Sequence, residues 1–340
     1  MRTHKNIFIS IGCSLLFFSK VATAQDPIFS QYFVSPLTIN PSFLGKDVQN
    51  TRATFNTRTQ WWGNNQNLFS TTTVAIEQRI GKSESNVNNL SIGCMVLSDQ
   101  SNNGLLKNNY ATAAVAYNKA LDKKGSMHIG LGLSFTYANR LVDQSKFESE
   151  SQFASLGFQG ALASNNVAVL GKNNYFEVNT GVNFSKVNEK NGFRIGVGYF
   201  HASKPKVGAF TTNQFSVDPR LSVQLSGFTE LKNKNELHVT TNTEMQGSFN
   251  VFTAGAIYKL FIGSEVLSKV NIGCFKRFGD AVYPYLGLEN DKCLVAFTYD
   301  FSTNGSKTTS VNIQSLELSL AWKFGKKKST SDVKQQVVSY

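Results

Sequence analysis

The residues that could act as acids, bases or nucleophiles in this sequence are few and far apart. Beyond the first 24 residues the histidines are His128, His201 and His238. Neither a G-x-S-x-G elbow nor an H-E-x-x-H helix motif occurs, so the motifs indicate neither a serine hydrolase nor a zinc protease. Glycine-rich phosphate loops and dinucleotide fingerprints are also missing from the sequence. We therefore expect no catalytic residue and no cofactor.

The cysteines give no sign of a metal site. Cys94, Cys274 and Cys293 follow the N-terminal region, and none has C-x-x-C spacing. An odd number of widely spaced cysteines is also not a disulfide framework. We expect no metal, and we interpret these residues as small apolar side chains that are buried or face lipid.

The N-terminus has the three parts of a secretory signal peptide. A basic start with Arg2 and Lys5 precedes an apolar run over 7–18, and the small residues Ala22 and Ala24 follow at a cleavage position. A transmembrane anchor is the alternative, but the run is shorter than the roughly 20 residues that cross a bilayer. We therefore assign residues 1–24 to the signal peptide and predict an exported protein.

The net charge of the whole chain is +12, and its basic residues are scattered along it. An exported protein rarely meets nucleic acid, so we expect no nucleic-acid partner. Anionic lipid headgroups are the more natural partner for this charge. After the signal peptide no stretch of 18 apolar residues occurs, so the sequence predicts no transmembrane helix.

Stepping along the chain, apolar residues recur with a period of two. In 129–137 the isoleucine, leucines and aromatics alternate with glycine, serine and threonine, and 193–199, 293–301 and 316–324 repeat the pattern. Each stretch predicts a strand with one apolar face. We expect fourteen strands: 51–61, 67–78, 89–98, 109–120, 126–139, 174–187, 192–201, 219–230, 236–246, 250–262, 267–278, 281–289, 291–303 and 312–324.

A soluble β-sandwich would also alternate, but two features favour a transmembrane antiparallel β-barrel. Many predicted strands reach ten to thirteen residues, whereas soluble strands average about 5–6. Aromatic residues also stand near strand ends, where they would form interfacial girdles. These are Trp61, Trp62, Tyr110, Tyr175, Tyr283, Trp322 and Phe324. Acidic residues in strands, such as Glu177, Glu244 and Asp300, could be catalytic, but a hydrated barrel interior explains them better.

The links between the predicted strands indicate an orientation. The links 99–108, 140–173 and 202–218 are long, whereas those after the fourth, sixth, eighth and tenth strands are short. Outer-membrane barrels have short periplasmic turns and longer outer loops. We therefore predict that both termini are periplasmic in the outer membrane of a Gram-negative bacterium. The link 79–88 breaks this rule.

Two segments lie outside the predicted barrel of 51–324. Residues 25–50 contain Pro27, Pro36 and Pro41, which cannot donate to a strand ladder. This N-terminal arm is also rich in aromatic residues, so we expect it to pack as a plug inside the barrel or as a cap at its periplasmic mouth. Residues 325–340 form a polar basic tail, either disordered or in contact with anionic periplasmic partners.

The arm and the first strand carry a distinctive motif. The arm contains D-P-I-F-S-Q-Y over 26–32 and N-P-S-F-L-G over 40–45, and the strand contains R-A-T-F-N-T-R-T-Q-W over 52–61. This region resembles the PorP/SprF family of outer-membrane proteins of the type IX secretion and gliding system. The matching residues are Asp26, Phe29, Ser30, Gln31, Tyr32, Asn40, Pro41, Gly45, Arg52, Asn56, Arg58, Gln60 and Trp61. The tail beyond Phe324 departs from barrels that end at their last aromatic residue.

The resemblance implies a non-enzymatic protein that helps to export or anchor a secreted cell-surface adhesin through the adhesin's C-terminal domain, together with type IX secretion components. The long outer links would be the working surface. The matching residues would then bind a partner or hold the plug. The alternative is a porin-like channel, or a channel for hydrophobic solutes, gated by the arm.

The first predicted strand suggests how the motif works. By the period of two, Arg52, Thr54, Asn56, Arg58 and Gln60 share a face that points into the lumen, while Phe55 and Trp61 face lipid. We hypothesise that this lumen row hydrogen-bonds the arm, with Asp26 pairing an arginine. The row could instead serve only to close the barrel and secure its plug.

Overall fold

The computed structural model describes residues 26–46, 51–61, 68–80, 88–143, 153–154, 157–158, 173–207, 215–303 and 314–325. The predicted signal peptide lies outside the described residues, as does the predicted tail after Gly325. Trp62 and the link 81–87 also lie outside them.

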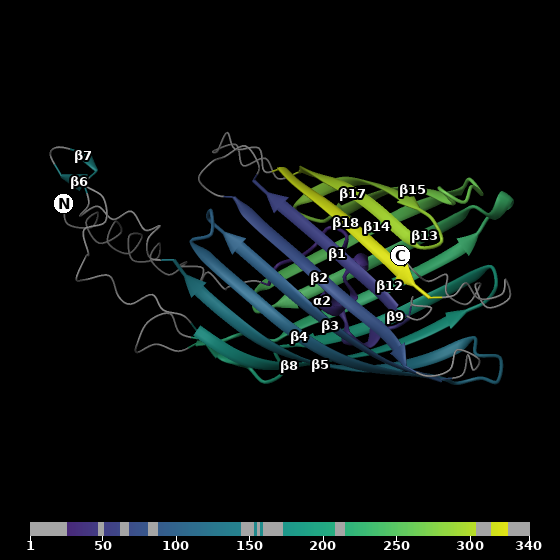
Figure 1. Ribbon diagram of the computed structural model, residues 1–340, viewed down its shortest axis with the longest axis horizontal. Coiled ribbons are helices and arrows are strands. Elements are labelled where there is room, and N and C mark those ends of the chain that lie inside the picture. The colour runs from purple at the N-terminus through teal and green to yellow at the C-terminus, as the bar shows by residue number, and fades with distance from the viewer. Residues whose placement is uncertain are drawn as a thin grey trace, which may run out of the picture.

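Fourteen antiparallel strands form a closed barrel in which β1 pairs with both β2 and β18 (Figure 1). The prediction of a fourteen-stranded antiparallel barrel is therefore confirmed, and each predicted strand boundary lies within three residues of the observed one. The barrel strands are β1 Thr51–Gln60, β2 Phe69–Ile80, β3 Asn88–Ser101, β4 Leu106–Ala120, β5 Met127–Val142, β8 Asn173–Val187, β9 Asn191–Phe200, β12 Arg220–Glu230, β13 Glu236–Gln246, β14 Phe249–Phe261, β15 Lys269–Arg277, β16 Ala281–Glu289, β17 Cys293–Ser302 and β18 Gln314–Phe324.

The period of two places apolar side chains on the outer surface. In β5, Leu131, Leu133 and Phe135 are exposed, whereas the intervening Ser134 and Thr136 are buried. A surface of this kind is stable in lipid, because the hydrocarbon solvates the apolar face while the closed ladder pairs the backbone groups. No helix among the described residues is long and apolar enough to cross a membrane.

The two ends of the barrel differ. We call the end where β1 begins and β18 ends the terminal end, and the opposite end the distal end. The distal links 143–172 and 201–219 are long, as predicted, and each contains a short two-stranded sheet. These sheets pair β6 Phe153–Ala154 with β7 Gly157–Phe158, and β10 Lys206–Val207 with β11 Phe215–Ser216.

The predicted long link 99–108 is wrong. β3 and β4 pair as far as Ser101 and Leu106, so the link is the short turn 102–105. Polar residues such as Asp99 and Asn108 made this stretch look like a loop, but they face the lumen. Positive φ angles at Asn102, Asn103 and Gly104 then reverse the chain.

The predicted aromatic girdle is also partly wrong. Trp322 and Phe324 are each half exposed, as a lipid-facing girdle requires. Tyr283, however, is fully buried, and Tyr110 lines an internal cavity. These two tyrosines fall on the inward phase of their strands, and phase decides direction whatever the position along the strand.

Residues 26–46, called the arm below, lie inside the ring of strands (Figure 1). The arm contains three short helical turns, η1 Tyr32–Val34, α2 Pro36–Ile39 and η2 Pro41–Phe43, all of whose residues are buried. A further turn, η5 Lys232–Lys234, lies in the β12–β13 link. The arm contacts β4, β5, β8, β9 and β18. The packed interior of the barrel is therefore the interface between the arm and the wall.

Candidate functional site: the seat of the arm

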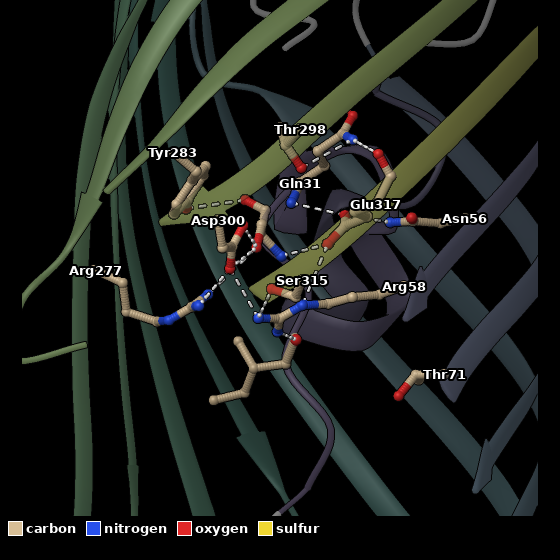
Figure 2. Close-up of polar contacts among 12 residues, drawn as sticks. Gln31, Asn56, Arg58, Thr71, Arg277, Tyr283, Thr298, Asp300, Ser315 and Glu317 are labelled. Atoms are coloured by element: carbon tan, nitrogen blue, oxygen red, sulfur yellow. Dashed lines mark hydrogen bonds and ion pairs between the residues drawn. The ribbon is translucent and has the colours of Figure 1, made fainter. Parts of the chain in front are cut away.

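Ser30 and Gln31 of the arm are held by Asp300 and Glu317 of the last two strands, and Figure 2 shows these two carboxylates beside Gln31. The Glu317 carboxylate accepts the backbone N–H groups of Ser30 at 2.7 Å and of Gln31 at 2.8 Å. The Ser30 hydroxyl donates to Asp300 at 2.9 Å. Backbone N–H groups paired with buried carboxylates form strong, directional hydrogen bonds. We call Asp300 and Glu317, together with the side chains that contact them or Ser30, the seat.

Two arginines complete the seat by neutralising Asp300. Arg58 of β1 and Arg277 of β15 approach the same Asp300 oxygen at 2.9 Å and 2.6 Å. Arg58 also donates to the backbone carbonyl of Ile28 in the arm, and Tyr283 donates to the carbonyl of Ser30 at 3.1 Å. Each of these side chains is buried, so each charge depends on its partners rather than on water.

The predicted lumen row of β1 faces inward as expected. Arg52, Thr54, Asn56 and Arg58 are buried. Arg58 donates directly to the arm, whereas Asn56 reaches it through Glu317, to which it donates at 3.2 Å. Arg52 acts through Glu77, whose carboxylate also accepts the N–H of Gly45 at 2.7 Å.

The other two residues of the β1 motif lie near the distal end. Gln60 ends β1 and lines a cavity there. Trp61 follows the strand with a positive φ of 62° and packs edge-on against Phe69, with 4.7 Å between ring centroids. Because Trp61 lies beyond the strand, the strand period does not set its direction.

Asn40 and Pro41 build the sharp turn into η2. The Asn40 side chain caps η2 by accepting the Ser42 N–H at 2.9 Å, and its amide donates to Gln224 at 3.1 Å. Pro41 fills the first helical position, where no backbone donor is needed. The motif thus fixes a local turn and ties it to the wall of β12.

Glycines in the wall make room for this turn. A Cβ on Gly132 of β5 would lie 2.3 Å from the Ser42 nitrogen, and one on Gly181 of β8 would lie 2.0 Å from the Asn40 side-chain oxygen. At Gly132 the obstructing atoms belong to the backbone of the arm. Only glycine allows the arm and the wall to approach so closely there.

The aromatic residues of the arm pack against the opposite wall. Tyr32 forms a 2.9 Å hydrogen bond with Thr240, and Phe33 stacks on Phe275 at 5.5 Å between centroids. Phe29 is buried as well. The arm therefore contacts the wall with both polar and apolar side chains.

Asp26 pairs with an arginine, but not with one of the β1 row. Its carboxylate lies 3.0 Å from Arg220 of β12 and 2.7 Å from His201. His201 bridges in turn to Glu177 at 2.5 Å, and Arg220 to Glu244 at 2.6 Å. The start of the arm is thereby tied to the base of the long distal link 201–219.

These ionic contacts shift both pKa values of the Asp26–His201 pair. Burial would raise the pKa of Asp26, but His201 and Arg220 hold it well below its ordinary value of 3.8. Burial would lower the pKa of His201, but the charge of Asp26 and the hydrogen bonds that His201 donates to Asp26 and Glu177 raise it to about 10. His201 is therefore a protonated bridge between two carboxylates at neutral pH.

We expect Asp26→Asn to reduce stability most between pH 3.8 and 6.5, and progressively less as the pH rises from 6.5 to about 10. The raised pKa of His201 stabilises the fold fully below 6.5, and that contribution is lost as the pH rises through about 10. The lowered pKa of Asp26 stabilises it above 3.8, and that contribution is lost as the pH falls below this value. Urea midpoints of wild type and variant across this range measure the difference. A pH-independent gap would contradict the assignment.

Two cavities adjoin the start of the arm. A small chamber of about 50 Å³ is bordered by Leu37, Met95, Leu97, Tyr110 and Phe200, with the Asp26–His201 pair at one side. A larger cavity of about 650 Å³ lies at the distal end and shares Asp26 and Pro27 with the chamber. Among the described residues, no group of three or more His, Cys, Asp or Glu side chains is arranged so that it could hold a metal ion.

The sequence did not identify five wall residues that contact the arm. All five occupy inward positions of predicted strands, so the period of two indicates that they face the lumen. They are Glu77, Arg220, Arg277, Tyr283 and Glu317. Nothing in a single sequence shows which of them meets the arm, because Ser30 and Glu317 are 287 residues apart.

Solved structures of similar fold include a toluene transporter and a monoaromatic hydrocarbon channel. The toluene transporter TbuX of Ralstonia pickettii has a TM-score of 0.50 and 8% identity, over 86% of this chain and 94% of TbuX. A deltaS2S3 mutant of the monoaromatic hydrocarbon channel TodX, from P. putida, also has a TM-score of 0.50 and 8% identity, over 84% and 92% of the two chains. At this identity the likeness shows the fold alone.

No curated protein sequence matches this chain. The profile of the type IX secretion system membrane protein family PorP/SprF, in contrast, matches residues 21–322. That span contains the arm, the seat and nearly the whole barrel. The chain therefore belongs to the PorP/SprF family of type IX secretion system membrane proteins.

Proposed function

We propose that this chain is a non-enzymatic outer-membrane component of type IX secretion, which helps to export or anchor a secreted cell-surface adhesin through its C-terminal domain. Family membership supports the secretion role. The observation that carries the rest is the seat, where motif residues from the arm and β1 converge on Asp300 and Glu317. An arm that is held in one position keeps the interior of the barrel in a defined shape below the distal links, where partners would bind.

The proposal includes an orientation. The terminal end faces the periplasm, where type IX components are reached, and the distal links 143–172 and 201–219 face outward. The arm acts as a plug, since its residues are buried among the inward faces of the strands. Lipid surrounds the exposed apolar wall.

A pull-down of the tagged protein from gently solubilised outer membranes tests the partners. Mass spectrometry is expected to identify a large secreted adhesin and type IX components. Recovery of the folded barrel with no such partner would count against the secretion role. A tagged, unrelated outer-membrane barrel is the control for proteins that merely share the membrane.

We expect Arg58→Ala to abolish surface display of the adhesin while the barrel still folds. Asp300 keeps Arg277 as its partner at 2.6 Å, whereas the arm loses the hydrogen bond to the Ile28 carbonyl. Display is measured by antibody labelling of intact cells, and folding by heat-dependent gel mobility. Arg79→Ala is the matched control, since Arg79 lies near the terminal end of β2, away from the seat. If display falls only as far as the folded fraction falls, the seat has a purely structural role.

The second candidate function is a channel for hydrophobic solutes gated by the arm. The apolar chamber beside Leu37 and Phe200 favours it, and the fold resembles the hydrocarbon channels TbuX and TodX. A gated channel predicts that deletion of residues 26–46 raises the conductance of the protein in planar bilayers. A secretion partner without a solute path predicts lost adhesin display and unchanged conductance.

A further inference from the structure

The larger cavity, which we call the distal vestibule, lies at the distal end of the barrel, where several strands end or begin. Its lining includes Gln60 at the end of β1, Phe69 at the start of β2, Ser101 at the end of β3 and Phe249 at the start of β14. Its volume of about 650 Å³ lies within the roughly 300–1,000 Å³ range of small-molecule sites. The vestibule is therefore large enough for a ligand of a few residues.

Most charged groups of the vestibule are already paired. Arg58 and Arg277 are held by Asp300, and Asp26 is held by His201 and Arg220. Asp280 pairs with Arg277 at 2.5 Å. These groups have partners within the protein and do not require a ligand.

Asp99 and Arg140 differ from the other charges. Within the part of the chain that the structure describes, the Arg140 side chain makes no hydrogen bond or ion pair, although its charge acts on Asp99. Asp99 accepts hydrogen bonds from Thr71 at 2.7 Å and from Asn108 at 3.4 Å, but no described cation lies within ion-pair distance of it. The vestibule thus presents one negative and one positive group that attract each other across the cavity, although no described residue forms a contacting ion pair with either of them.

The strand register fixes the spacing of the two backbone positions that carry these side chains. Asp99 of β3 lies opposite Asn108 of β4, and Asn108 lies opposite Arg140 of β5. Two steps across an antiparallel ladder place the Cα atoms of Asp99 and Arg140 about 10 Å apart. An extended peptide advances roughly 3.3–3.6 Å per residue, so the charged ends of a tripeptide span a similar distance.

From this arrangement we propose that the distal vestibule binds a short zwitterionic peptide. The peptide carboxylate lies on Arg140 and its ammonium group on Asp99, with the Asn108 amide between them. Phe69, Phe249 and Phe278 line the same cavity and provide apolar surface for the peptide side chains. Recognition of both chain ends selects short free peptides over internal segments of a longer chain.

Isothermal titration of the detergent-solubilised, folded protein with trialanine tests this proposal. We expect saturable binding that weakens about tenfold or more in Arg140→Gln and in Asp99→Asn, the loss typical of one charge-assisted hydrogen bond. Lys107→Gln is the matched control for the arginine, because Lys107 precedes Asn108 and points to the opposite face of β4. Glu265→Gln, in the terminal link 262–268, is the control for the acid. Neither control should change the affinity.

Peptides with blocked ends decide which groups are recognised. N-acetyl-trialanine should lose the dependence on Asp99, and trialanine amide should lose the dependence on Arg140. Equal binding of a doubly blocked tripeptide, or no binding of trialanine to wild type, overturns the proposal. Heat-dependent gel mobility of each variant confirms that the compared proteins are folded.

Discussion

Replacing Asp300 with alanine is expected to lower the free energy of unfolding of the barrel by about 3–5 kcal/mol, the usual cost of breaking a buried ion pair. The substitution leaves Arg58 and Arg277 buried without the carboxylate they share, and it removes the acceptor of the Ser30 hydroxyl. Equilibrium unfolding in urea from detergent micelles measures this change.

Asp280→Ala is the matched control, because Asp280 is a second acid on Arg277. Its side chain is 50% exposed, so water replaces much of the lost interaction. We expect a change below about 1 kcal/mol. Equal effects of the two substitutions would show that the burial of Asp300 does not increase its contribution to the free energy of unfolding.

Gly132→Ala is expected to displace η2 of the arm from the wall. The added methyl group would lie 2.3 Å from the Ser42 nitrogen and 2.4 Å from the Pro41 carbonyl carbon, and backbone atoms of a buried turn cannot yield cheaply. Overpacking of this kind costs about 1–3 kcal/mol, which corresponds to about a 5- to 150-fold greater population of the displaced arm.

Maleimide labelling of a Thr38→Cys variant measures that displacement, with Cys94, Cys274 and Cys293 replaced by alanine. Thr38 is buried in the seated arm, so labelling requires the arm to move. Gly227→Ala is the control, because the nearest atom to a Cβ there is a backbone oxygen at 3.3 Å that does not belong to the arm. Similar labelling rates for both alanine variants would disprove the close fit at Gly132.

The barrel could be predicted from the sequence because each strand carries its own signal. A period of two over a stretch such as 129–137 fixes both the strand and its lipid face, without knowledge of its neighbours. The predicted link 99–108 was wrong because its polar residues face the lumen, where they resemble those of a loop. The predicted girdle position of Tyr283 was wrong because the phase of its strand, and not its place near the strand end, sets its direction.

The seat could be predicted only in part. The motif identified Ser30, Gln31, Asn56 and Arg58, and the period placed Arg58 in the lumen. The partner of Asp26 proved to be Arg220, on the wall opposite to the expected row. Such a choice depends on how a closed ring brings β12 across from β1, which no local pattern encodes.

The position of Asp300 and Glu317 in the last two strands has a consequence for the order of folding. The arm is the first segment of the described chain, yet Ser30 meets partners 270 and 287 residues later. Contacts of such long sequence separation form late, because the chain entropy of the whole intervening loop must be lost first. The arm can therefore be locked only after the final strand has joined β1. Docking of the arm therefore follows closure of the ring. In a chain truncated before β17, the arm would lack Asp300 and Glu317 and would not be held at the seat.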